Sequence, residues 1–339
     1  MILYGGPFLL LASVPAFYYG LGTAGPLVTI VLLLAALIGA EFVAPRGAVP
    51  PAQAGNFRVL FYVYVPLQLV SIGWATALST RAGALAFVCL GLGVGVTTGV
   101  FGMLAAHELV HSRRKGERVL GAAMLGGMLY RHFRIAHIHV HHRWAATERD
   151  SATARLGESF YTFLLRTLPG QFLEAWRFER VRRPGSAFLA SRIAVDIAVA
   201  LASLGTIAAL WGAKGTLFFV LQAFVAMTVL ELFNYIAHYG LRRGVDASGR
   251  FEPLADRHSW NSSNVLVNLL IFNMGRHSYH HRKPSISYQE LQFVGAAPEL
   301  PAGYAGSILL ALVPSLWRRV MDGRAVAHTT SIPETRLAA

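Results

Sequence analysis

The chain has 339 residues, of which 54% are hydrophobic and only 14% are charged, and its formal net charge is +13. A soluble protein would carry about 25% charged residues, so this composition argues against a soluble domain and favours an integral membrane protein. The basic residues are scattered between apolar runs and form no recognisable binding module, which argues against a nucleic-acid partner. The single cysteine, Cys89, excludes an internal disulfide and a cysteine-ligated iron–sulfur site built from this chain alone.

Six apolar runs are each close to the roughly 20 residues that a membrane-spanning helix needs. We therefore predict an all-α integral membrane protein with six transmembrane helices, at about 6–23, 25–44, 58–79, 84–106, 189–211 and 215–236. The first run follows no basic segment and precedes no small-residue cleavage site, so we interpret it as a retained helix. Residues 1–320 would form a single membrane domain, and residues 321–339 are expected to be a disordered tail.

Basic residues avoid the loops on one predicted side of the membrane. Only Arg81 and Lys214 lie in loops that would face that side. Because loops rich in arginine and lysine stay in the cytoplasm, we expect the active site and both termini to be cytoplasmic, in a bacterial-type inner membrane. Polar segments on this side would form a cytoplasmic helical cap that contains two histidine-rich regions, 107–142 and 238–281.

Nine of the 13 histidines gather in four groups in these two regions. Histidines spaced by three or four residues lie on one face of a helix, so separate segments would direct imidazoles to a common site. Imidazole binds iron, zinc and copper, and nine ligands exceed the three or four that one zinc ion takes, which indicates two metal ions. The predicted ligands are His107, His111, His137, His141, His142, His238, His277, His280 and His281.

Few polar residues near these histidines could hold the ligands in place. Metal-bound imidazoles usually donate their second N–H to a carboxylate or a carbonyl. The candidates for this role are Glu108, Asp150, Glu231, Asn234 and Asp256, although an ordinary surface or capping role explains each of them equally well. Among the other histidines, only His258 is a further candidate.

The string His107-Glu-Leu-Val-His111 also matches the zinc-protease signature, in which a glutamate is the general base between two zinc ligands. An intramembrane zinc protease would leave seven clustered histidines unexplained, so it is a remote alternative. A metal transporter or sensor is also disfavoured, because transporter sites usually lie near the bilayer midplane and these histidines gather at one face.

In these motifs the chain resembles the membrane-bound alkane 1-monooxygenase family, within the wider fatty-acid desaturase and hydroxylase group. The resemblance spans about 104–290 and rests on four motifs in order: His-Glu-x-x-His at 107–111, His-x-x-x-His-His at 137–142, Asn-Tyr-x-x-His-Tyr-Gly-Leu at 234–241 and Arg-His-Ser-x-His-His at 276–281. The third motif distinguishes this family from ordinary desaturases. Ala237 and Tyr279 stand where family members usually carry a glutamate and an aspartate.

The resemblance implies a non-haem diiron monooxygenase in which the nine histidines hold two irons. It would use O2 to hydroxylate an unactivated C–H bond, at a terminal or side-chain methyl, of a hydrophobic substrate such as an alkane or an alkyl-aromatic compound. An apolar channel between the spans would lead to the histidines. Fatty-acyl desaturation or oxidative decarboxylation at the same site is the alternative.

Electrons would come from outside the chain, which carries no nucleotide-binding fingerprint. The resemblance implies NAD(P)H as their source, with a reductase and a rubredoxin or ferredoxin as carriers. Such carriers are acidic and could dock on cytoplasmic arginines, although positive-inside topology explains the same residues. These arginines are Arg113, Arg114, Arg177, Arg180, Arg182 and Arg183.

Overall fold

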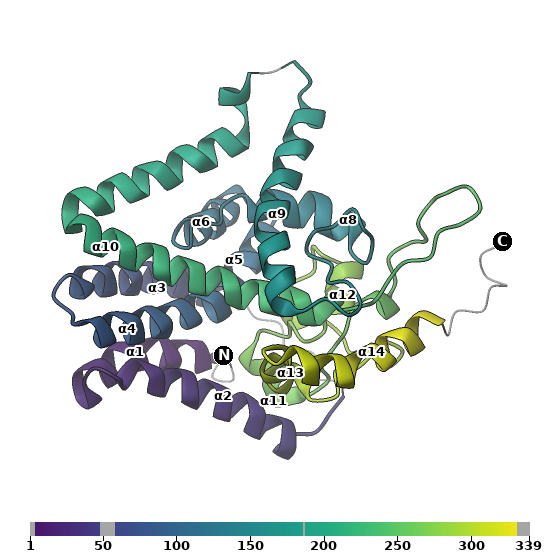
Figure 1. Ribbon diagram of the computed structural model, residues 1–339, viewed down its shortest axis with the longest axis horizontal. Helices are drawn as coiled ribbons and strands as arrows, with labels where there is room; N and C mark the ends of the chain where they lie inside the picture. The colour runs from purple at the N-terminus through teal and green to yellow at the C-terminus, as the bar shows by residue number, and fades with distance from the viewer. Residues whose placement is uncertain (1–3, 48–57, 186, 331–339) are drawn as a thin grey trace.

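The computed structural model describes residues 4–47, 58–185 and 187–330. These residues form helices connected by turns and loops, and within them β-structure is limited to three isolated bridges. The predicted all-α fold is therefore confirmed. The long apolar helices form a bundle, and the shorter helices α8, α11, α12 and α13 gather toward one end of it (Figure 1).

Four helices are long and apolar enough to cross a membrane: α2 (Gly25–Val43), α3 (Val59–Ser79), the continuous helix Ala84–Val110 and α10 (Arg192–His238). Helix α1 (Gly6–Leu21) is equally apolar but shorter. The fifth and sixth predicted runs both lie in α10, which bends sharply at Gly212. The backbone φ of Gly212 is 64°, in the left-handed region that glycine adopts without strain, so the two halves of α10 form a hairpin.

The helix Ala84–Val110 carries the first histidines and packs closely against the second half of α10. It consists of α4 (Ala84–Thr97), a π-helical turn η2 (Thr98–Gly102) and α5 (Met103–Val110). Glycines allow this approach: a Cβ atom added at Gly95 would lie 2.6 Å from Val225 Cβ, and one at Gly99 would lie 2.7 Å from the carbonyl oxygen of Ala226. Small residues at such contacts let the two backbones come together.

Further elements connect and flank these long apolar helices. Before α10 they are α6 (Lys115–Gly126), α7 (Phe133–Ala136), the π-helical turn η3 (His137–His141), α8 (His142–Trp144), α9 (Phe160–Arg182) and the 3-10 turn η4 (Phe188–Ala190). After α10 they are the 3-10 turn η5 (Asp256–His258), α11 (Val265–Leu270), α12 (His277–Arg282), the 3-10 turn η6 (Tyr288–Glu290) and α13 (Gly303–Ala311).

The expectation of a disordered tail from residue 321 is wrong for its first ten residues, because helix α14 runs over Pro314–Thr330. Trp317, Met321 and Ala325 recur every four residues along it and are fully buried. Trp317 packs on the rings of Tyr235 and Tyr239, with centroids 5.5 and 5.2 Å away. This apolar stripe stabilises the helix although most of its other residues are polar. The rest of the predicted tail, 331–339, lies outside the described residues.

The glycine contacts give a test of the packing. We expect Gly95→Val to lower the stability of the detergent-solubilised protein by about 1–3 kcal/mol, because the added methyl groups collide with Val225. The control is Gly39→Val, since a Cβ atom at Gly39 meets nothing within 4 Å. Thermal unfolding measures both variants, and equal melting temperatures would contradict the close helix contact.

Candidate metal centre

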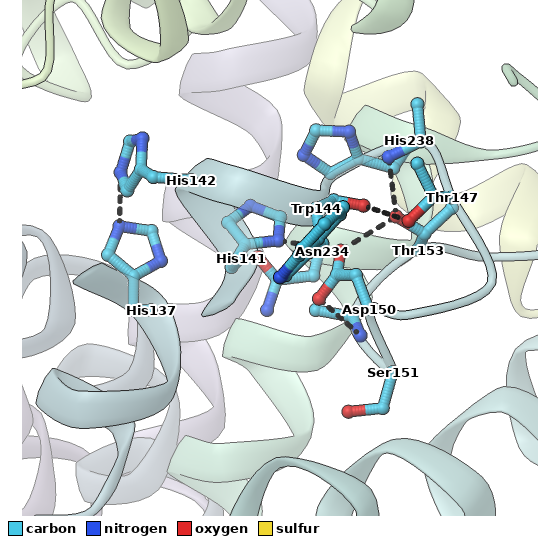
Figure 2. Close-up of polar contacts among 12 residues, drawn as sticks. His137, His141, His142, Trp144, Thr147, Asp150, Ser151, Thr153, Asn234 and His238 are labelled. Carbon is cyan, nitrogen blue, oxygen red and sulfur yellow. Dashed lines mark hydrogen bonds and ion pairs between the residues drawn. The ribbon is translucent and has the colours of Figure 1, made fainter. Parts of the chain in front are cut away.

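The nine predicted ligands come together in two groups. Five of them have ring nitrogens within 4.8 Å of one another, and the remaining four form a second group by the same criterion. Cluster A consists of His107, His111, His137, His142 and His280, and cluster B consists of His141, His238, His277 and His281. In Figure 2, His137 and His142 lie together, apart from His141 and His238.

Regular helical spacing explains two of the pairs. His107 and His111 lie one turn apart at the end of α5, and both belong to cluster A. His277 and His281 lie one turn apart on α12 and both belong to cluster B. His280, which points to a different side of the same short helix, reaches cluster A, so α12 serves both clusters.

The prediction for the second histidine box is wrong in one respect. Four-residue spacing predicted that His137 and His141 share one face, but residues 137–141 form a π-helical turn. A π-helix bonds residue i to i+5 and so brings residues five apart onto one face. His137 and His142 therefore meet in cluster A, with Nε2 atoms 3.1 Å apart, whereas His141 faces cluster B.

The distances between ring nitrogens fit a metal ion at each cluster. In cluster A the Nε2 atom of His111 lies 3.0 Å from that of His137, and in cluster B the Nε2 atom of His277 lies 3.0 Å from those of His238 and His281. Two imidazole nitrogens that bind one ion at about 2.1 Å, at right angles, would lie about 3.0 Å apart. Several buried ring nitrogens also have no hydrogen-bond partner among the described residues, including both of His107 and Nε2 of His141.

Burial keeps these imidazoles neutral, which leaves a lone pair for a metal ion. Burial lowers the pKa of His111 to about 3 and, together with the neighbouring imidazoles, holds the pKa values of His280 and His281 well below the usual value. Metal binding requires the neutral ring, so these groups need not lose a proton first.

Asp150 hydrogen-bonds to one histidine of cluster B (Figure 2). Its carboxylate accepts a hydrogen bond from Nδ1 of His141 at 2.9 Å and another from the Thr153 hydroxyl at 2.7 Å. Burial alone would raise the pKa of Asp150, but His141 and Thr153 hold it below its usual value. The bond from Thr153 holds the carboxylate in place, and the bond from His141 holds the imidazole ring. Nε2 of His141 then remains free to face cluster B. His258 contributes through its backbone, since its carbonyl oxygen lies 3.4 Å from Nδ1 of His238.

The other four candidates do not hydrogen-bond to a clustered histidine. Glu108 faces away from its neighbour His107, because adjacent helical residues point about 100° apart, and it accepts from Arg58. Glu231 is fully buried and accepts from Tyr130, Gln171 and Asn234. Asp256 instead forms an ion pair with Arg282 at 2.8 Å. Sequence proximity alone could not distinguish these residues from Asp150.

The remaining histidines lie outside both clusters, as expected. His132 packs on Phe172, His139 on Phe178 and His328 on Trp260. The zinc-protease interpretation of 107–111 finds no support, because His107 and His111 share their cluster with three further imidazoles and Glu108 does not face it.

An apolar pocket ends at the two clusters. His107 and His137 of cluster A and His277 of cluster B all contribute to its wall. The rest of the lining is apolar apart from Asn234 and Tyr304, and it comes mainly from α2, η2, α5, α7, α10, α11 and α13. It includes Leu37, Val100, Leu104, Leu230, Phe233, Val267 and Ile308. Such a pocket suits a hydrophobic molecule of which one end lies near both clusters.

The chain matches one protein-family model and several known proteins. Residues 82–308 match the family model described as "Fatty acid desaturase". The chain is 38% identical to alkane 1-monooxygenase 2 of Pseudomonas aeruginosa over 87% of this chain and 81% of that protein, and 36% identical to alkane 1-monooxygenase of Ectopseudomonas oleovorans over 87% and 75%. It is 30% identical to the xylene/toluene monooxygenase hydroxylase component XylM of Pseudomonas putida, over 65% of this chain and 59% of that protein.

The contact between Asp150 and His141 can be tested through metal retention. We expect Asp150→Asn to weaken the metal affinity of cluster B about 10–100-fold, as is typical when the partner of a ligating histidine is changed. Asp256→Asn is the matched control, because Asp256 pairs with Arg282 instead of a histidine. Metal content after dialysis against graded chelator measures both, and equal retention would refute the orienting role.

Proposed function

Because the chain belongs to the membrane-bound alkane 1-monooxygenase family and is an integral membrane, oxygen-dependent monooxygenase, we propose that its nine clustered histidines hold two irons. Cluster A would supply five imidazoles to one iron and cluster B four to the other. The observation that carries this proposal is the convergence of nine imidazoles, seven of them buried and two half-buried, in two adjacent groups at the end of an apolar pocket.

The two departures from the family pattern leave both clusters complete. Tyr279 packs against the guanidinium of Arg282 at 4.7 Å and the ammonium of Lys283 at 5.4 Å. Ala237 is fully buried, and its carbonyl accepts from the backbone N–H of Trp260 at 2.8 Å. Neither residue belongs to a cluster, so these substitutions do not remove a ligand.

Bound iron would supply the activation of O2, and the chain's own residues would position the substrate and exclude water. The pocket wall is apolar, so it favours hydrocarbon over water beside the clusters. His107 and His277 line the same pocket, so a substrate carbon bound at its end would lie close to both clusters. Asp150 holds the His141 ring in one orientation.

We propose an alkane or the methyl group of an alkyl-aromatic compound as the substrate, hydroxylated at an unactivated C–H bond. The names of the relatives include alkanes, xylene and toluene, and the apolar lining agrees with such molecules. Among the described residues no arginine or lysine lines this pocket, so a free fatty-acid carboxylate would lack a counter-ion there. This argues against a free fatty acid whose carboxylate lies inside the pocket, whereas product analysis separates hydroxylation from desaturation or decarboxylation of an acyl chain.

The topology follows from the same proposal. Six spans would result if α1 and each half of α10 cross the membrane separately, with the histidines and both termini on the cytoplasmic side. Only Arg81 and Lys214 lie at the opposite ends of the spans, which supports this orientation. Helix α14 packs on Tyr235 and Tyr239 of the segment that carries His238, so the domain would extend to at least residue 330. Electrons would arrive from NAD(P)H through a reductase and a rubredoxin or ferredoxin.

Iron content tests the metal assignment. We expect the purified protein to bind about two irons per chain, and His280→Ala or His238→Ala to lose about one each, because they belong to different clusters. His139→Ala is the control, since His139 stacks on Phe178 outside both clusters. A single zinc ion that survives both substitutions would overturn the diiron assignment.

A second test addresses the substrate. Leu104 lines the pocket one turn before His107, so Leu104→Phe narrows the pocket beside cluster A. We expect it to lower kcat/KM for an alkylbenzene about tenfold more than for a linear alkane, since the bulkier ring fits less well. Leu309→Phe makes the same change at an exposed site on α13 and should leave kcat/KM for both substrates unchanged. Unsaturated or shortened products would favour desaturation or decarboxylation.

A further inference from the structure

The first half of α10 stands away from the helix bundle (Figure 1). Between Arg192 and Trp211 only Ile193, Ala194, Asp196 and Ile207 are buried. A groove separates this half from α3 and α6, and it lies at the depth of the membrane helices. Its apolar lining includes Leu69, Ile72, Ala123, Val199, Ala202 and Ile207.

At the end of the spans where the histidines lie, the groove meets a strongly basic surface. Ala123 and Arg131 line both hollows, so the apolar groove and the basic surface are continuous. The basic surface is lined by Lys115, Arg118, Arg131, Arg134 and Arg192, and no carboxylate of the described residues lines it.

The positive charge of this surface is only partly neutralised. Arg131 and Arg134 share one carboxylate, that of Asp196, at 3.0 and 2.7 Å. Arg192 is paired with Glu179 at 2.6 Å. Among the described residues, Lys115 and Arg118 form no ion pair, and Arg118 donates to the backbone carbonyls of the loop before α6. An anion would therefore gain from contact with Lys115, Arg118 and the Arg131–Arg134 pair.

We propose that this groove binds an anionic diacyl phospholipid, with an acyl chain along the first half of α10 and the phosphate headgroup on the basic surface. A gap between helices at membrane depth is filled by acyl chains, because exposing it to water or leaving it empty is unfavourable. Basic residues at the membrane surface attract anionic headgroups at about 1 kcal/mol each. This inference requires only that the chain lies in a membrane and does not depend on the proposed reaction.

A soluble acidic carrier protein fits the basic surface but not the apolar groove that continues from it. The groove continues between α3 and the first half of α10, which would both span the membrane, so a folded soluble protein could not enter this part of it. His111 of cluster A also lines the basic surface, so a bound headgroup would lie beside one edge of that cluster. The lipid would thus shield a ligand that is otherwise only partly covered.

Lipid retention tests the proposal. The full chain is purified from nanodiscs that contain equal amounts of phosphatidylglycerol and phosphatidylcholine, and co-purified lipids are quantified by mass spectrometry. We expect enrichment of phosphatidylglycerol, and a loss of about fivefold per charge in Lys115→Gln/Arg118→Gln. Arg318→Gln/Arg319→Gln removes the same charge from exposed positions on α14 and should keep the enrichment.

Three further arms separate the possible outcomes. Ala202→Phe fills the apolar groove without a change of charge and should reduce retention of both lipids, whereas Arg118→Lys should retain the enrichment. Soluble glycerol phosphate should not raise the melting temperature as phosphatidylglycerol does.

Unchanged enrichment in both the double variant and Ala202→Phe would overturn the proposal. So would a double variant that retains lipid but binds an acidic ferredoxin or rubredoxin more weakly, because the surface would then be a carrier site.

Discussion

The close packing of imidazole rings in clusters A and B is the constraint on which the rest of the structure depends. Pairs of Nε2 atoms lie 3.0–3.2 Å apart in cluster A, and burial keeps the rings neutral. A neutral imidazole donates from only one nitrogen, so three or more converging Nε2 atoms cannot satisfy one another by hydrogen bonds. Each lone pair left without a partner costs about 1–3 kcal/mol. A cation at the centre removes this cost, which is why the arrangement favours metal binding over a purely structural role.

The two clusters are coupled through the shortest elements that carry them. Helix α5 serves only cluster A and α10 only cluster B, but α12 contributes His277 and His281 to cluster B and His280 to cluster A. The turn η3 and the helix after it are likewise divided, with His141 in cluster B and His142 in cluster A. Each of these short segments therefore carries histidines of both clusters. A distortion of either element would alter both clusters at once.

Sequence spacing predicted the site where the local helix is regular and failed where it is not. The pairs His107–His111 and His277–His281 lie as a 3.6-residue period requires. The π-helical turn at 137–141 has no signature in residue type, because it arises when tertiary contacts force an extra residue into a turn. Glu108 adjoins a ligand in sequence but points to Arg58, whereas Asp150 reaches His141 because its loop folds back. The buried apolar stripe on α14 could not be recognised in the sequence, because most of the residues around it are polar.

The two halves of α10 have different roles because they pack differently. In the second half, close contacts with Gly91, Gly95 and Gly99 hold the helix against α4 and η2, which fixes the backbone that leads to His238 and the pocket wall. The first half has few buried residues and borders the groove beside α6. The bend at Gly212 separates them, so the first half can border the groove without interrupting the packing that leads to His238. In the proposed lipid site the headgroup would lie on the basic surface beside His111, away from the close helix contacts that hold the second half.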